Sequence, residues 1–288
     1  MKLNDLFNQK CPTLSFEVFP PKKDTEYGSV QEAVTEIARL KPDFMSVAYG
    51  AGGGTSDYTA QLAGSVQQEG VAALAHLTCV SSSREQVGEQ LELLRRQGVE
   101  NILALRGDIP TGMTLTADRP YHYSAQLIRD IREFGGFSIG AACYPEGHVE
   151  CASQSEDLIH LKEKVDEGCD FLVTQMFFDN STLYSFLYRA QRLGIQVPVV
   201  AGVMPVTSAG QIARICQLSG TTLPQRFRMI VDKFGSNPAA MKQAGIAYAT
   251  EQIVDLIANG MRGVHVYTMN KPDVAAQIAA NLSEIMGR

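Results

Sequence analysis

Short apolar runs alternate with longer segments of helical periodicity along most of the chain. Eight runs rich in β-branched and aromatic residues predict strands at 13–20, 43–50, 71–79, 101–107, 137–145, 171–178, 197–205 and 263–270. Most of these runs are apolar at consecutive positions rather than at alternate ones, which is typical of strands covered on both faces. The pattern therefore predicts a parallel sheet with helices packed against it.

The spacing of these runs predicts how the sheet is connected. Successive runs begin 26 to 36 residues apart, apart from a last interval of 66 residues, and parallel strands need crossovers of about this length. Eight such units predict one domain over 1–288, a single (β/α)₈ or TIM barrel. The long interval predicts a helical excursion at 221–236 and 238–259, before the last strand. An open doubly wound sheet is the weaker alternative, because no GxGxxG follows the first strand.

Composition narrows the class of protein. The chain has 288 residues, of which 45% are hydrophobic and 19% charged, so it can bury a sizeable core. Its net charge of −6 argues against a general electrostatic grip on nucleic acid or on an anionic membrane. No apolar run reaches the roughly 20 residues of a membrane span, and the N-terminus lacks the apolar core of a signal peptide. A cytoplasmic protein is expected.

Several kinds of reactive site are disfavoured. The six cysteines are scattered without a CxxC, and neither HExxH nor GxSxG occurs, so we expect reduced thiols and no metal centre. Schiff-base chemistry is also disfavoured, because the only lysine near a predicted strand end is Lys271, just past the eighth run.

Polar residues gather where the predicted strands end, which is where barrel enzymes place their chemistry. Glu17 lies inside an apolar run, so it either pairs with a structural arginine or acts as a general acid whose pKa is raised by apolar surroundings. Arg106 and Asp108 either form a local turn pair or bind a ligand. His76 is either a satisfied core histidine or part of the site. The glycine run at 50–54 resembles a phosphate loop only weakly, since no Lys-Ser/Thr follows it.

Motifs along nearly the whole chain resemble one family. They are SFEVFPP at 15–21, VAYGAGG at 47–53, AHLTC at 75–79, ALRGD at 104–108, YPEGH at 144–148, TQMFFD at 174–179, GVMPV at 202–206 and HVYTMN at 265–270. With these motifs the chain resembles the flavin-dependent methylenetetrahydrofolate reductases of the short bacterial type. The resemblance implies an FAD-bearing barrel that reduces 5,10-methylenetetrahydrofolate to 5-methyltetrahydrofolate for methionine synthesis. It also implies NADH or NADPH as electron donor, a homo-oligomer, and no added regulatory domain.

The same resemblance implies roles for individual residues. Glu17 matches the acid that protonates folate N10, and Asp108 matches the aspartate beside the flavin N1–C2 edge. Gln175 matches the glutamine whose amide binds the pterin or nicotinamide. The implied folate contacts are Asp108, Gln175, Gln211, Tyr267 and Lys271. The implied FAD contacts are Tyr49, Ala51, His76, Arg106, Gly107, Asp108, Tyr123, Ser124, Tyr144, His148, Cys151, Asp157, His160 and Lys164, with Arg106 and Lys164 facing the pyrophosphate.

Some residues depart from the family's pattern. Ala48 replaces a common threonine, Lys271 a common arginine, His160 a usual asparagine and Glu163 a usual arginine. The loss of a hydroxyl at Ala48 leaves room for a partner protein, instead of reduced nicotinamide, as the source of electrons. Two other hypotheses are a flavin barrel of the proline-dehydrogenase kind and a flavin- or folate-binding module without catalysis. The FEVFPP and RGD elements and the retained Glu17 argue against them.

Overall fold

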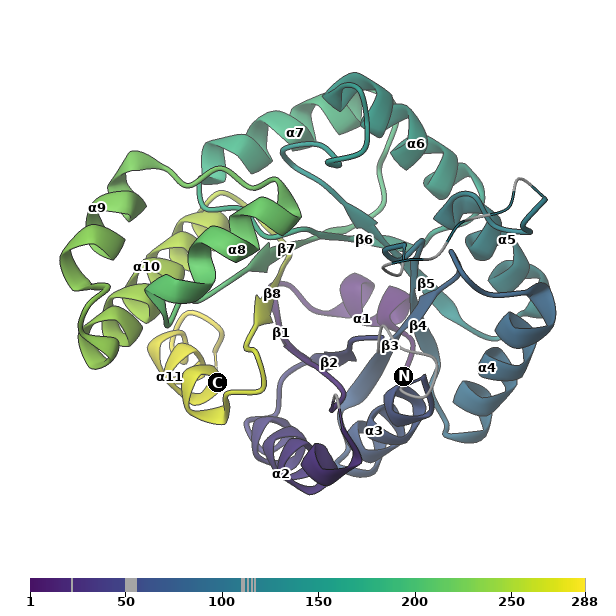
Figure 1. Ribbon diagram of the computed structural model, residues 1–288, viewed down its shortest axis with the longest axis horizontal. Helices are drawn as coiled ribbons and strands as arrows, with labels where there is room; N and C mark the ends of the chain where they lie inside the picture. The colour runs from purple at the N-terminus through teal and green to yellow at the C-terminus, as the bar shows by residue number, and fades with distance from the viewer. Residues whose placement is uncertain are drawn as a thin grey trace.

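Eight parallel strands close into a barrel in sequence order (Figure 1). This architecture comes from a computed structural model that describes residues 1–21, 23–49, 56–109, 112, 114, 116 and 118–287. The strands are β1 Thr13–Val18, β2 Phe44–Val47, β3 Ala72–Thr78, β4 Asn101–Leu105, β5 Ser138–Cys143, β6 Phe171–Thr174, β7 Val199–Val203 and β8 Gly263–Tyr267. Each lies within one predicted run, so the predicted (β/α)₈ barrel is confirmed.

Helices surround the barrel and cover the outer face of its strands (Figure 1). They are α2 Tyr27–Ala38, which follows the short 3₁₀ turn η1 Asp24–Glu26, α3 Ser56–Gln68, α4 Arg84–Arg96, α5 Ser124–Phe134, α6 Gln154–Asp166, α7 Asn180–Arg192, α8 Ala209–Ser219, α9 Gln225–Phe234, α10 Pro238–Ala258 and α11 Pro272–Asn281. Helices α9 and α10 form the predicted excursion before β8. None of the helices in the described ranges is long and apolar enough to cross a membrane.

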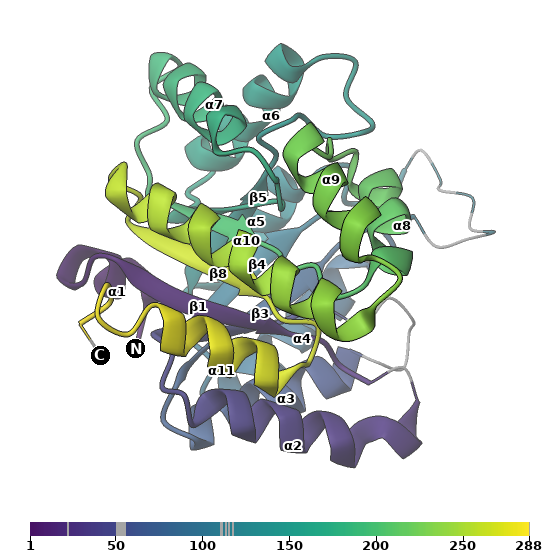
Figure 2. The ribbon, with the colours of Figure 1, turned by 90° about the vertical axis from the view of Figure 1, so that its left-hand side faces the viewer.

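One α-helix lies before the first predicted strand and was not predicted, the short helix α1 at Leu3–Gln9. Its Phe7 ring contacts Phe44 at the start of β2 and Phe171 at the start of β6, with ring centroids 6.0 and 5.1 Å apart. The backbone N–H of Leu3 donates to Asn101 Oδ1 at 2.7 Å. Helix α1 thus closes the N-terminal end of the barrel, and Figure 2 shows it at the same end as both chain termini.

Strand register brings polar side chains together inside the barrel. Glu17 of β1 lies opposite Ser46 of β2 and Tyr267 of β8, and Ser15 lies opposite His265. Side chains alternate between the two faces of a strand, so Ser15 and Glu17 share a face, as do His265 and Tyr267. With the opposite end closed by α1, these residues face the C-terminal end of the barrel.

Candidate active site

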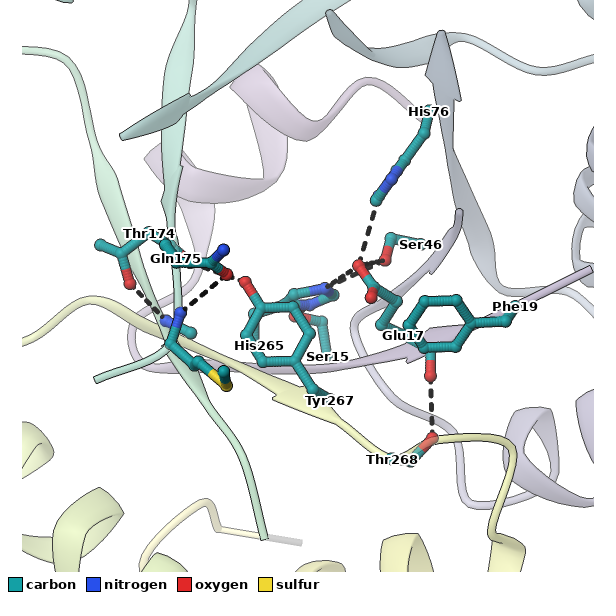
Figure 3. A network of polar contacts seen from close by, with 12 residues as sticks. Ser15, Glu17, Phe19, Ser46, His76, Thr174, Gln175, His265, Tyr267 and Thr268 are labelled. Atoms are coloured by element: carbon teal, nitrogen blue, oxygen red, sulfur yellow. Dashed lines mark hydrogen bonds and ion pairs between the residues drawn. The ribbon is translucent and has the colours of Figure 1, made fainter. Parts of the chain in front are cut away.

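Glu17 is buried in the barrel interior among polar neighbours. Its Oε2 lies 3.2 Å from Ser46 Oγ, 3.4 Å from His76 Nε2 and 3.6 Å from His265 Nε2 (Figure 3). The Thr268 hydroxyl donates to the Glu17 carbonyl at 2.8 Å and holds the strand end in place. In the described part of the chain no arginine pairs with Glu17. The structure therefore does not support the structural-arginine alternative.

The electrostatics around Glu17 correct one expectation. Burial acts to raise the pKa of this carboxyl and is the largest single influence. The contact with His265, the attraction of both histidines and the Ser46 hydroxyl act in the opposite direction and together lower the pKa below its ordinary value. The predicted rise was wrong because it took the surroundings to be apolar. An acid role for Glu17 therefore requires that its neighbours help to hold the proton.

His76 is a buried histidine with an unpartnered nitrogen. It is only 7% exposed, and desolvation lowers its pKa to about 4. The imidazole is therefore neutral at neutral pH. Its Nε2 lies 3.4 Å from Glu17 Oε2 and has no hydrogen-bond partner among the described residues. The satisfied-core alternative does not hold here, and the free nitrogen suits contact with a ligand.

Tyr267 and Gln175 are placed by β8 and by the end of β6. The Tyr267 hydroxyl donates to the Thr174 carbonyl at 2.6 Å, and burial raises its pKa well above the ordinary value. The ring can lie there because residue 202 is glycine, where a Cβ would come within 2.6 Å of the Tyr267 hydroxyl. Gln175 follows Thr174 directly and is half-buried, and its Oε1 accepts from the Met176 backbone N–H at 3.2 Å.

A cavity of about 320 Å³ lies between the ends of β4 and β5 and the helices α5 and α6. Nine residues predicted to contact FAD line it: Arg106, Tyr123, Ser124, Tyr144, His148, Cys151, Asp157, His160 and Lys164. The sequence resemblance did not depend on their being close together in space. The structure brings these nine residues to one cavity.

Two cations of this cavity have different partners. Arg106 donates through both terminal nitrogens to Glu150, at 2.5 and 2.8 Å, so the predicted alternative of a turn pair with Asp108 is wrong. Lys164 donates to the Ala142 carbonyl at 2.9 Å, and desolvation lowers its pKa despite the attraction of Asp157. Both side chains line the cavity, and Arg106 would have to leave Glu150 to meet an anionic ligand.

Aromatic rings stack on the cavity wall. The Tyr123 and His160 rings are 5.1 Å apart with an interplanar angle of 19°, and Tyr144 meets His148 edge-on at 4.7 Å. His160 Nδ1 also lies 3.1 Å from Glu163 Oε2. Two departures from the family's pattern, at 160 and 163, therefore contact each other.

The remaining predicted residues are spread around the barrel mouth. Tyr49 is half-buried against the main core, and Gly107 adopts a φ of 83° that places Asp108 at an exposed position after β4. Gln211 is exposed in the first turn of α8, and Lys271 Nζ donates to Thr207 Oγ1 at 2.6 Å, just before that helix. Ala51 and the glycine run at 50–54 lie outside the described residues.

Sequence reasoning gave no role to four residues that contact the predicted site. Ser15, Ser46 and His265 line the barrel interior beside Glu17, and Glu150 pairs with Arg106. The alternation of side chains along β1 could have placed Ser15 on the face of Glu17. The strand register that selects Ser46 and His265 could not be read from one sequence. No group of histidine, cysteine or carboxylate side chains within the described ranges could hold a metal ion.

The sequence is similar to that of known proteins along nearly its whole length. The family model for methylenetetrahydrofolate reductase matches residues 2–283. A 5,10-methylenetetrahydrofolate reductase of Pectobacterium carotovorum is 33% identical over 93% of this chain and 89% of its own length. A methylenetetrahydrofolate reductase (NADH) of Arabidopsis thaliana is 32% identical over 99% of this chain, which spans 50% of that protein.

A solved structure shares the fold at low identity. It is an uncharacterized protein from Clostridium thermocellum that binds two copies of 5-methyl-5,6,7,8-tetrahydrofolic acid. The TM-score is 0.66 with 11% identity, over 100% of this chain and 99% of the other. At this identity the likeness speaks for the architecture alone.

Proposed function

The chain belongs to the methylenetetrahydrofolate reductase family, whose enzymes are oxidoreductases of one-carbon metabolism, and on that premise we propose how it works. It binds FAD, takes electrons from NADH or NADPH, and reduces 5,10-methylenetetrahydrofolate to 5-methyltetrahydrofolate. The product supplies the methyl group for methionine synthesis. Bound FAD would supply a carrier that accepts hydride from nicotinamide and passes it to folate.

The cavity between α5 and α6 supports FAD as the cofactor. Arg106 and the half-buried Lys164 offer positive charge to a pyrophosphate, and Asp157 can accept from a ribose hydroxyl. Burial raises the pKa of Asp157 against the attraction of Lys164. The free Nε2 of His76 is a buried donor or acceptor for the isoalloxazine edge. These groups fit an anionic dinucleotide.

One observation carries the folate chemistry: a carboxyl is buried inside the barrel, with the Nε2 atoms of His76 and His265 within 3.6 Å of its Oε2. The methylene bridge of the substrate must open to an iminium before it accepts hydride. Protonating N10 makes that nitrogen a better leaving group, and Glu17 is positioned to donate the proton. Gln175 and Tyr267 are positioned to hold the pterin or the nicotinamide ring.

A three-step spectroscopic titration tests this proposal. The purified protein should show the visible spectrum of bound flavin, NADH or NADPH added without oxygen should bleach it, and methylenetetrahydrofolate should then restore it. Formation of 5-methyltetrahydrofolate should match the amount of flavin reoxidised. A colourless protein that binds no added FAD would overturn the proposal.

The same titration decides between two electron donors. Ala48 is 7% exposed at the end of β2 and offers no hydroxyl to a nicotinamide, which favours reduction by a partner protein as the second candidate. Flavin that stays oxidised with NADH and NADPH, but is reduced by dithionite and then reoxidised by the folate, would support the partner. The resemblance also supports a homo-oligomer. A molar mass in solution of at least twice the 31.4 kDa of one chain would support it.

A further inference from the structure

A turn just past β8 holds two adjacent residues in a conformation that side chains disfavour. Met269 and Asn270 each have a φ of 55°, and they are two of the three non-glycine residues with positive φ in the described part of the chain. The Lys271 N–H donates to the Thr268 carbonyl at 3.2 Å and closes the turn. Asparagine tolerates the left-handed region, but methionine rarely adopts it. Such a conformation persists only where the surrounding contacts enforce it.

The Asn270 side chain turns back to the end of β1. Its Oδ1 accepts from the Phe19 backbone N–H at 2.8 Å, and its Nδ2 donates to the Phe19 carbonyl at 2.9 Å. The orientation of the amide is fixed, because a backbone N–H can only donate and a carbonyl can only accept. Pro20 and Pro21 follow, and neither has an N–H with which to continue a strand. The Asn270 amide thus extends the attachment of β1 to β8 beyond Glu17, the last β1 residue that pairs with β8.

Thr268 holds the same stretch of backbone two residues earlier. Its hydroxyl donates to the Glu17 carbonyl at 2.8 Å (Figure 3), and Thr268 is only 2% exposed. On the other side of β1, the Ala48 N–H donates to the Val18 carbonyl at 2.9 Å. The backbone from Glu17 to Phe19 is therefore held from both sides, and on the β8 side it is held by side chains of the turn.

The same turn reaches two of the predicted folate contacts. Lys271, its last residue, donates from Nζ to Thr207 Oγ1 at 2.6 Å. Thr207 lies just before α8, which carries Gln211 in its first turn. The segment 268–271 therefore connects the predicted acid, Glu17, with the part of the barrel mouth where the folate is proposed to bind.

We propose that Asn270 is a positioning residue for reduction of the folate: by holding Phe19 it sets where the Glu17 carboxyl stands relative to folate N10. The proposal rests on the function proposed above. Asn270 touches no reacting atom and transfers no proton. Proton transfer requires the donor and acceptor atoms to approach to hydrogen-bond distance, so a small displacement of the end of β1 lowers the rate more than it lowers the affinity for folate.

Asn270→Gly tests the proposal, because glycine adopts a positive φ freely and only the amide is lost. The maximal rate of flavin reoxidation by methylenetetrahydrofolate should fall by on the order of 10- to 100-fold, while the folate concentration that gives half of it changes by less than about threefold. Flavin reduction by NADH should keep its rate. Thr268→Val keeps the shape of the side chain without the hydroxyl and should also slow reoxidation. Asn259→Gly, which removes an amide bonded to the Asp255 carbonyl at the end of α10, is the matched control and should change neither.

The Glu17→Gln background gives a readout that a merely structural role would not move. Asn270→Gly should slow reoxidation almost no further in this background, because no acid is left to position. If the effects of the two substitutions multiply, or if Asn270→Gly keeps the maximal rate, the proposal is overturned.

Hydrogen exchange at the Phe19 amide tests the underlying contact without FAD or folate. Nitrogen NMR on protein labelled at phenylalanine should show that this N–H exchanges at least about ten times faster in Asn270→Gly than in the unchanged protein. Equal exchange in the two proteins would mean that the Asn270 amide does not hold Phe19, and would also overturn the proposal. The exchange result stands even if the protein reduces no folate, so the two proposals can fail separately.

Discussion

At the residue scale, Arg106 and Glu150 form a pair that FAD must rearrange if the proposed cofactor binds. Arg106 is 21% exposed in its side chain and gives both terminal N–H groups to Glu150. Arg106→Gln removes a charge-assisted contact to the pyrophosphate and should weaken FAD binding by on the order of 10- to 100-fold. Glu150→Gln frees the guanidinium and should tighten binding. Quenching of FAD fluorescence measures both.

A second arginine, which also pairs with a glutamate, provides the control for Arg106→Gln. Arg129 of α5 pairs with Glu167 away from the cavity, so Arg129→Gln should leave FAD affinity unchanged. If Arg129→Gln and Arg106→Gln weaken binding equally, the loss reflects the overall charge of the protein. The cavity assignment would then be wrong.

The burial of His76 predicts how the free energy of unfolding depends on pH. Its folded pKa of about 4 lies below the ordinary value of 6.5, so the unfolded chain binds the proton more readily. This contribution to stability is fully present above pH 6.5 and is lost as the pH falls toward 4. Between pH 7 and pH 5, His76 should account for about 2 kcal/mol of the decrease in the free energy of unfolding. Urea unfolding at the two pH values should show a smaller loss in His76→Gln, and an equal loss would contradict the assignment.

At the element scale, the packing of helix α1 allows a prediction about the stability of the protein that does not involve the site. Phe7 fills the closed end of the barrel between Phe44 and Phe171. Phe7→Ala should lower the free energy of unfolding by about 3–5 kcal/mol, without changing FAD affinity once the protein is folded. Phe234→Ala at the half-exposed end of α9 is the control and should cost far less. Urea unfolding monitored by circular dichroism measures the difference.

The elements also show what one sequence can predict. All eight strands could be placed because parallel strands buried on both faces are mostly apolar at consecutive positions, as in β7, where all five residues are apolar. Helix α1 was missed because seven residues are too few to display helical periodicity. Its stability comes from contacts with β2 and β6, which are distant in sequence.

The site could be predicted where residue types alone indicate it. It could not be predicted where it depends on how neighbouring strands are aligned. Glu17 could be singled out because a carboxylate in an apolar run is costly. The direction of its pKa shift could not, since His265 and Ser46 reach Glu17 only through the pairing of β1 with β8 and β2. Glu150 was overlooked because nothing in the segment after β5 indicates that it meets the end of β4.

At the scale of the whole molecule, the net charge of −6 opposes the anionic ligands that the site is proposed to bind. Attraction must therefore come from local cations, and Arg106, Lys164 and Lys271 stand at the C-terminal end of the barrel. None of the predicted site residues in the described part of the chain lies at the closed end, which α1 covers. The fold thus separates an end that stabilises the barrel from an end proposed to carry the chemistry.

The most direct test of the central claim separates the two half-reactions in Glu17→Gln. This variant keeps the shape of the side chain but cannot donate the acid proton. Flavin reduction by NADH should proceed at the rate of the unchanged protein, while reoxidation by methylenetetrahydrofolate should slow by on the order of 100-fold or more. Reoxidation at an undiminished rate would contradict the assignment of Glu17 as the acid.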